Sequence, residues 1–207
     1  MQLEQTGVLL LDVIPQLVDA IRRQSFEGVR VALAAGTDPN AYVERTSMLG
    51  WLFGSPARLT EMDGEQWLEI LRALLEAGAD PNQSIDEYPD KPAYLLHDLA
   101  QHALLPAMRL MLEFGANPNL LDDDGDTALD LACTDANFVK SCKLPVEYVG
   151  RELPEYPLPS DEVFDRQGLA FHLWLMSRHQ RGGELLRKAG ALHARELPMV
   201  TADSRAL

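Results

Sequence analysis

The sequence "LRALLEAGADPN" (residues 71–82) describes an amphipathic helix that ends in a glycine and a turn, and the chain repeats this pattern. Related stretches are "VRVALAAGTDPN" at 29–40 and "MRLMLEFGANPN" at 108–119. Glycine directly after a helix is favoured because it adopts the left-handed conformation without strain. The proline then fixes φ, and we expect the asparagine to tolerate a left-handed turn. Three copies of one helix ending predict an array of similar units.

A second motif recurs in phase with the first. The sequence "DDDGDTALDLA" (residues 122–132) fits the pattern D-x-x-G-x-T-[PA]-L-x-x-A. Together with the glycine-ended helices, it resembles the ankyrin repeat. The resemblance implies an all-α solenoid of stacked helix-turn-helix units with hairpin fingers, in which neighbouring units share one core. It also implies a structural, hydrogen-bonding role for His97. The predicted core includes Leu74, Leu75, Leu110 and Leu112.

The distance from the inner-helix leucine to the closing glycine gives the register of the array. In the family's unit this distance is about 19 residues. It is standard in two units and longer in two others: Leu17–Gly36 (36 − 17 = 19), Leu96–Gly115 (115 − 96 = 19), Leu49–Gly78 (78 − 49 = 29) and Leu129–Gly190 (190 − 129 = 61). We therefore expect ten extra residues near 54–63 and a large insertion in the last unit.

The register predicts one ankyrin-repeat domain over residues 1–207. Its parts are repeat 1 (8–40), repeat 2 (41–82), repeat 3 (83–119), repeat 4 (120–196, with an insertion at about 136–178) and a tail (197–207). The finger that opens repeat 3, "QSIDEYPDKPAY" (83–94), is longer than the next one and is expected to project further.

The insertion has two contrasting parts. Residues 142–161 are rich in proline, which is typical of an extended strap. Residues 161–180 are strongly apolar and predict a helix with Asp161 as its N-cap. An apolar helix of this kind either packs on its own repeats or forms an interface with a partner or a second copy. Both interpretations remain open at the level of sequence.

The chain is strongly acidic. It has 207 residues, 46% of them hydrophobic, and a formal net charge of −14. Residues 61–90 contain nine acidic side chains and only Arg72 as a base. The charged side chains of residues 166–195 are mainly basic. Such a charge repels phosphates, so we expect neither nucleic acid nor an anionic membrane as a partner. An acidic face suits a protein partner with a basic surface.

Two further patterns indicate a cytoplasmic protein. The two cysteines, Cys133 and Cys142, are too few for a disulfide framework and lack C-x-x-C spacing. The N-terminal stretch has no basic region before its apolar run, and no apolar stretch approaches the roughly 18 residues of a membrane span.

Catalytic and ligand-binding motifs are missing from the sequence. G-x-S-x-G, H-E-x-x-H, the P-loop and G-x-G-x-x-G do not occur. The acidic run at 122–126 is no EF-hand, because placing Gly125 at loop position 6 puts Leu120 and Leu131 at the ligating positions 1 and 12. We therefore expect no enzyme activity, no cofactor and no metal.

The remaining prediction is a protein-binding adaptor or inhibitor, and one specific form of it is an immunity or antitoxin-type neutraliser. The candidate contact residues are those that the repeat pattern leaves free: Asp86, Glu87, Tyr88, Asp90, Asp123, Asp124, Asp126 and Trp51. Trp51 has two interpretations, an aromatic contact for the partner or burial under the strap. The alternative function is structural, with self-association as a homodimer through the insertion.

Overall fold

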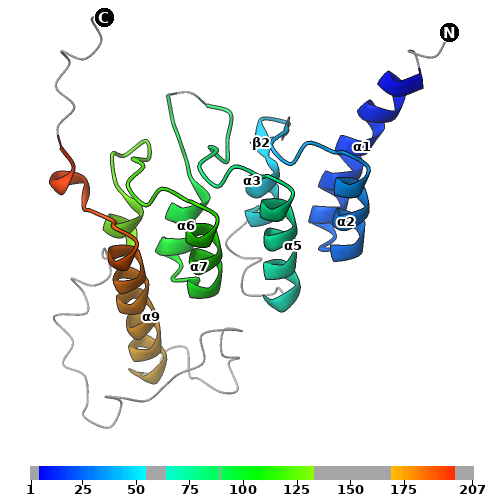
Figure 1. Cartoon of the computed structure of the whole chain (residues 1–207). Helices are drawn as coiled ribbons and strands as arrows, with labels where there is room; N and C mark the ends of the chain where they lie inside the picture. Colours follow the sequence, from blue (N-terminus) through cyan, green and yellow to red (C-terminus); the bar gives the residue numbers. More distant parts are fainter. Residues whose placement is uncertain (1–4, 55–63, 89, 133–168, 199–207) are drawn as a thin grey trace, which may run out of the picture.

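The structure, a computed structural model, describes residues 5–54, 64–88, 90–132 and 169–198 (Figure 1). The described elements are α1 (Gln5–Arg22), α2 (Phe26–Ala34), β1 (Tyr42–Val43), β2 (Thr46–Ser47), α3 (Met48–Phe53), α5 (Gly64–Glu76), α6 (Leu95–Gln101), α7 (Leu105–Glu113), α9 (Leu169–Lys188) and the short 3₁₀ helix η2 (Ala194–Glu196). Residues 128–132 are also helical and follow Thr127, as the second motif predicts.

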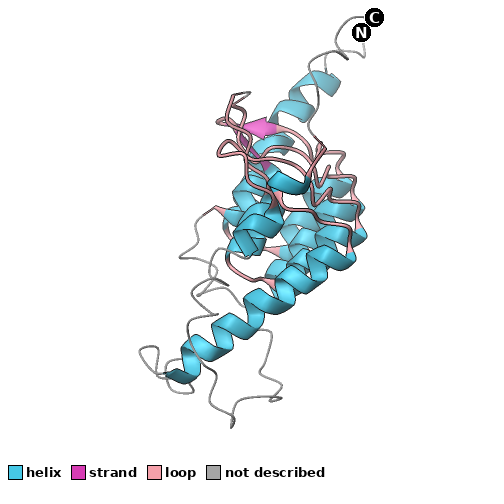
Figure 2. Cartoon of the chain, turned by 90° about the vertical axis from the view of Figure 1, so that its left-hand side faces the viewer, coloured by secondary structure: helices cyan, strands magenta, loops and turns pink. Residues whose placement is uncertain are grey.

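Helix pairs lie side by side in chain order. Figure 1 shows α1 with α2, then α3 with α5, then α6 with α7, and α9 beyond them. The chain is mostly helical, but the expected all-α class omits a small antiparallel sheet in which Tyr42 pairs with Ser47 and Val43 with Thr46. Figure 2 shows this sheet and most of the loops gathered at one end of the helix pairs, with the first turns of α1 projecting beyond them.

The repeated glycines end their helices as predicted. Gly78 has a φ of +96°, its N–H donates to the carbonyl of Leu75, and the next N–H, of Ala79, donates to Leu74. The same pattern recurs at three other glycines: Gly36, Gly115 and Gly190. No atom would lie within 4 Å of an added Cβ at any of these positions. The glycine is therefore required by the backbone conformation and not by lack of space.

The asparagine of the repeated turn joins one unit to the next. The Asn82 amide N–H donates to the carbonyl of Gly115 (3.1 Å), and its Oδ1 accepts from the N–H of Asn117 (2.6 Å). Asn40 binds Gly78 and Asp80 in the same way, and Asn119 binds Gly190 and Leu192. The expected left-handed role of these asparagines is wrong, because none of them has a positive φ. Their side chains are inter-unit clips.

The core runs through the described units as one cluster of buried residues. Leu74, Leu75 and Leu110 are buried in it, as expected. Leu112 was also expected in the core, but it is only partly buried and packs against the cluster. Stacked helix faces supply the apolar burial.

Helix α9 (Leu169–Lys188) continues past residue 178, where the register predicts the end of the insertion. It continues without a break to Lys188, so the insertion does not end in a helix of its own but runs on into the last outer helix. The buried Arg178 donates from Nε and Nη2 to the carbonyl of Ala103, at 3.0 and 2.7 Å. Ala103 has a φ of +51°, so this arginine fixes the strained turn between α6 and α7.

The C-terminal segment is tied to the helix that begins after Thr127. The Asp130 carboxylate accepts from the N–H of Ala194 (2.8 Å) and lies 2.6 Å from Nδ1 of His193. Arg187 donates to Nε2 of the same ring, so Nδ1 carries the proton and donates to Asp130. Burial acts to raise the pKa of Asp130, but these bonds and those from Thr127 outweigh it and hold the pKa at about 2.

Several predictions fall outside the described residues. They concern most of the ten-residue excess at 54–63, Cys133 and Cys142, the strap at 142–161 and the N-cap Asp161. The division of residues 1–207 into four repeats with a tail remains a prediction.

The inter-unit clips predict a measurable loss of stability. Asn82→Ala removes one donor and one acceptor and leaves two backbone groups without partners, so we expect the free energy of unfolding to fall by about 1–3 kcal/mol. Asn82→Asp, which keeps the acceptor for the Asn117 N–H, is expected to lose less. Urea unfolding followed by circular dichroism measures both, and an Asn82→Ala protein as stable as the parent would contradict the assignment.

Candidate functional site

Two fingers from adjacent units are paired with each other. The hairpin finger (residues 41–47) carries β1 and β2, and the long finger (residues 83–94) lies against it. The N–H of Ser47 donates to the carbonyl of Ile85 (2.9 Å), and the N–H of Glu87 donates to the carbonyl of Arg45 (2.8 Å). Within the long finger, the N–H of Ile85 bonds to Ala93 (2.8 Å). The long finger is therefore held by backbone hydrogen bonds, and Figure 1 shows it rising above the turns beside it.

The tip of the long finger presents an aromatic ring next to carboxylates. Glu87 and Asp90 are exposed, and Tyr88 is 47% exposed. The guanidinium carbon of Arg45 lies 4.5 Å from the centroid of the Tyr88 ring, so one ring face is covered by a cation–π contact. Glu87, Tyr88 and Asp90 are thus available at the surface, with Arg45 as a basic neighbour that the sequence prediction did not include.

The third finger (residues 120–126) is built around Asp122. Its carboxylate accepts from the N–H groups of Asp124 and Asp126, at 3.1 and 2.9 Å. Asp123 and Asp124 point their side chains into solvent, whereas Asp126 is half-buried. Burial and then the charge of Asp122 raise the pKa of Asp126. Asp123 and Asp124 are therefore free for contact, and Asp126 belongs partly to the scaffold.

His97 connects an inner helix to this third finger. Its Nε2 lies 3.2 Å from the carbonyl of Leu120 and 3.1 Å from that of Asp126, so Nε2 carries the proton and donates to both. Burial lowers the pKa of His97 and keeps the ring neutral. The structural role implied by the family resemblance is confirmed.

Trp51 is held by contacts within the chain. Its indole N–H donates to the carbonyl of Val43 (3.2 Å), and the guanidinium carbon of Arg22 lies 5.6 Å from the ring centroid. The ring is half-buried. These contacts fix the hairpin finger on α3, whether or not the ring also meets a partner.

Asp98 is a site residue that the sequence prediction missed. It lies in the first turn of α6 and faces a hollow of about 340 Å³ that Asp86 also lines. Burial raises the pKa of Asp98 to about 6, and the charges of Asp86 and Asp122 add to the effect. Asp98 follows His97 at a position that the repeat pattern leaves free. Trp51 was chosen as a candidate because the repeat pattern leaves its position free, and the same reasoning applies to Asp98.

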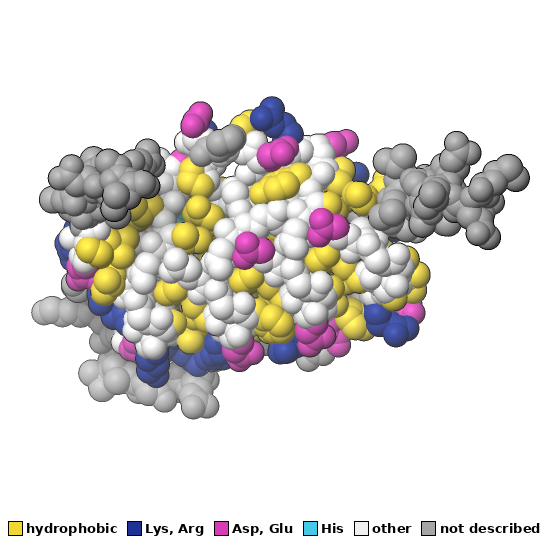
Figure 3. Space-filling view, turned by 45° about the horizontal axis from the view of Figure 1, so that its top comes forward, with side chains coloured by type: hydrophobic (Ala, Val, Ile, Leu, Met, Phe, Trp, Pro, Cys, Tyr) yellow, Lys and Arg dark blue, Asp and Glu magenta, His cyan; other side chains and the backbone are white. Residues whose placement is uncertain are grey.

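The acidic side chains do not form one continuous patch. Figure 3 looks onto the side of the fingers and shows Asp and Glu side chains standing apart among uncharged and apolar surface. The structure brings Asp86 next to Asp98 and places Asp123 and Asp124 on the following finger. The acidity of this face is therefore spread over adjacent fingers.

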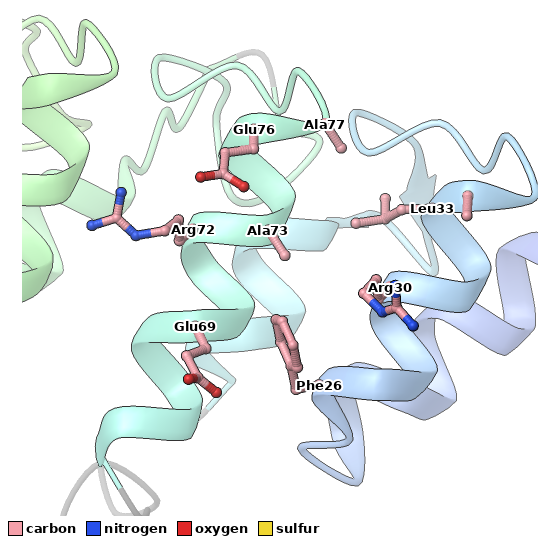
Figure 4. A pocket seen from close by; sticks show the side chains of 9 residues that line it. Phe26, Arg30, Leu33, Glu69, Arg72, Ala73, Glu76 and Ala77 are labelled. Carbon is pink, nitrogen blue, oxygen red and sulfur yellow. The ribbon is translucent and has the colours of Figure 1, made fainter.

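A second groove, of about 550 Å³, lies between the outer helices α2 and α5. Figure 4 shows Phe26 and Leu33 facing Ala73 across it, with Arg30 on the α2 side and Glu69 on the α5 side. Arg30 is paired with Glu27 at 2.8 Å. Charges of both signs line this groove, so it selects no single class of charged partner.

The described residues include no group of three or more side chains arranged to hold a metal ion. None of the helices described here combines the length and apolarity needed to cross a bilayer.

Comparison with known proteins identifies the repeat. Residues 96–142 match the family model described as ankyrin repeats (many copies). Over this segment the chain is similar to ankyrin repeats. Proteins of this family generally bind other proteins through the repeats and are typically not enzymes. The match covers α6, α7, the third finger and the helix after it, and it extends past the described residues at 132.

Two curated relatives are similar over part of their length. The chain is 32% identical over 121 residues to E3 ubiquitin-protein ligase Ufd4 of Drosophila melanogaster and 30% identical over 121 residues to E3 ubiquitin-protein ligase hecd-1 of Caenorhabditis elegans. Each alignment covers 56% of this chain but 4% of the relative. The similarity therefore concerns a small segment of each ligase.

The charge of Asp98 should destabilise the fold at neutral pH. Because its folded-state pKa of about 6 lies above the ordinary 3.8, the folded form binds its proton more tightly, and stability falls as pH rises through this window. We expect Asp98→Asn to raise the free energy of unfolding by about 1–3 kcal/mol at pH 7.5. The difference should vanish near pH 3.5.

Urea unfolding at the two pH values measures this effect. The matched control is Asp123→Asn at the exposed fingertip, which should change stability by less than about 0.5 kcal/mol. An Asp98→Asn protein less stable than the parent at pH 7.5 would show that the carboxylate is a stabilising structural group.

Proposed function

We propose that this chain is a solenoid of ankyrin repeats that binds another protein through its fingers and inner helices, without catalysing a reaction. The observation that carries the proposal is the combination of the repeat with fingertip side chains that the scaffold does not use. Glu87, Tyr88, Asp123 and Asp124 are exposed on adjacent fingers. The hydrogen bonds that hold these fingers are made by other groups, such as the backbone of Ser47 and Ile85 and the carboxylate of Asp122.

The charges favour a partner with a basic surface. The three fingers have five exposed carboxylates and two exposed bases: Glu44, Glu87, Asp90, Asp123 and Asp124 against Arg45 and Lys91. The net charge of −14 adds a long-range attraction for cationic proteins. Such a contact forms faster at low ionic strength and weakens with added salt.

The finger side is favoured over the groove between α2 and α5 for two reasons. The hairpin finger and the long finger are held to each other by backbone hydrogen bonds, so little free energy would be lost in ordering them on binding. The groove has both Arg30 and Glu69 along its sides and offers no comparable charge preference.

Charge reversal on two faces tests the proposal. The finger variant is Glu87→Lys/Asp123→Lys/Asp124→Lys, and Asp86 is left unchanged because the Thr46 hydroxyl donates to it at 3.3 Å. The matched control is Glu69→Lys/Glu76→Lys/Glu113→Lys, which makes the same charge change on the exposed sides of the outer helices α5 and α7.

We expect the finger variant to bind the natural partner, captured and identified with the parent chain, roughly tenfold or more weakly, because like charges then meet across the contact. The control should bind within about threefold of the parent, and parent binding should weaken with salt. Equal losses of binding in both variants, or retention in the finger variant with loss in the control, would place the contact elsewhere.

Light scattering on all three proteins measures self-association, which the alternative structural function requires.

A further inference from the structure

The hollow beside Asp98 is lined by elements of two neighbouring units. Its sides come from Thr46 of β2, from Gly50, Phe53 and Gly54 of α3 and its C-cap, from Ile85 and Asp86 of the long finger, and from Asp98 of α6. At about 340 Å³ it lies at the lower end of the size range of small-ligand pockets, about 300–1,000 Å³. It is therefore large enough for one long side chain.

The shape of the hollow is fixed by a close backbone approach. A Cβ added to Gly50 would lie 2.7 Å from the carbonyl oxygen of Ile85, so only glycine lets the long finger lie this close to α3. The same carbonyl accepts from the N–H of Ser47 at 2.9 Å. The hollow is thus part of the folded framework, and its backbone is set before any partner arrives.

The carboxylates in the hollow lack a positive partner. Within the part of the chain that the structure describes, the Asp98 carboxylate makes no hydrogen bond or ion pair, and the Asp86 carboxylate accepts only from the Thr46 hydroxyl, at 3.3 Å. The ionisable groups that act on Asp98 are Asp86 of the long finger and Asp122 of the third finger, and both are acids. A charge that the fold does not use and that lowers its stability is characteristic of a binding position.

We propose that this hollow receives one lysine or arginine side chain of the bound protein. The aliphatic stem lies against Phe53 and Ile85, and the cation lies between Asp86 and Asp98. Long cationic side chains bury their methylene groups on apolar surface while the charged end meets a polar site, and the hollow offers this combination. The inference rests on the proposed protein-binding function and specifies the chemistry of its contact.

A metal ion fits the hollow less well than an organic cation. Only two of the side chains that line it are carboxylates, and its lining also includes apolar Phe53 and Ile85. Hard cations such as Ca²⁺ take six or more oxygen ligands. A guanidinium or ammonium group needs only one or two carboxylates and gains from the apolar wall.

The experiment uses the full chain and small probes in place of the unknown partner. Nα-acetyl-arginine amide and Nα-acetyl-lysine amide are titrated into isotope-labelled protein, and Nα-acetyl-norleucine amide serves as the neutral probe of similar length. Nuclear magnetic resonance follows the amides of Gly50 and Ile85 and the carboxyl carbon of Asp98. A cationic probe should shift these signals and lower the pKa of Asp98, and the neutral probe should do neither.

Two variants decide the assignment. Asp98→Asn should weaken binding of the cationic probe at least about fivefold, because one of two charge-assisted contacts is lost. Glu113→Gln, on the outer helix α7, should leave it unchanged. Asp98→Asn is expected to fold at least as stably as the parent, so loss of binding cannot be attributed to unfolding.

Three results would contradict the proposal that the hollow binds a cationic side chain. They are equal shifts with the neutral probe, shifts spread over other surfaces, and unchanged binding by Asp98→Asn. These results are separable from failure of the proposed function. If the fingertip charge reversal still abolishes partner binding while the cationic probes leave the hollow unaffected, the proposed finger contact stands. The proposed binding of a cationic side chain in the hollow is then wrong. If the probes bind the hollow but charge reversal has no effect on the partner, the proposed finger contact is wrong.

Discussion

The structure depends on one repeated interaction, the clip that an asparagine side chain makes to the next unit. An amide side chain presents a donor and an acceptor side by side, and each clip uses both, on a glycine carbonyl and on the N–H two residues later. The glycine at that point is in the left-handed conformation, which directs its carbonyl to the preceding asparagine. The helix ending and the inter-unit contact are therefore one device, and it fixes the spacing of the units.

The spacing of the units decides what the fingers can form. Because the hairpin finger and the long finger come from units held side by side, the backbone of Ile85 can lie directly on Gly50. This contact closes the hollow and brings Asp86 of the finger next to Asp98 of the inner helix. The candidate site is thus a product of stacking, and neither unit alone contains it.

The features that could be predicted from the sequence are those that act within one unit. Glycine after a helix has one physical reason, and Gly78 and its counterparts adopt the expected positive φ. The structural role of His97 was expected from the family resemblance, and not from local chemistry, because its partners Leu120 and Asp126 lie in the next unit. The role of Asn82 was assigned wrongly because its partners, Gly115 and Asn117, lie in the next unit. Local turn chemistry contains no information about them.

The candidate site was predictable only in part for the same reason. Exposure of Glu87, Asp123 and Asp124 follows from their positions in fingers, where the repeat requires no particular side chain. The raised pKa of Asp98 comes from burial beside Asp86 and Asp122, which belong to different fingers.

Hydrogen exchange at the clip amides tests the central claim most directly. The N–H groups of Asp80, Asn117 and Leu192 lie in exposed turns, and their acceptors are the side chains of Asn40, Asn82 and Asn119. If the clips hold the units together, these amides exchange at least about a hundredfold more slowly than the same sequence in an unfolded chain. Exchange at the unfolded-chain rate in the native protein would contradict the account.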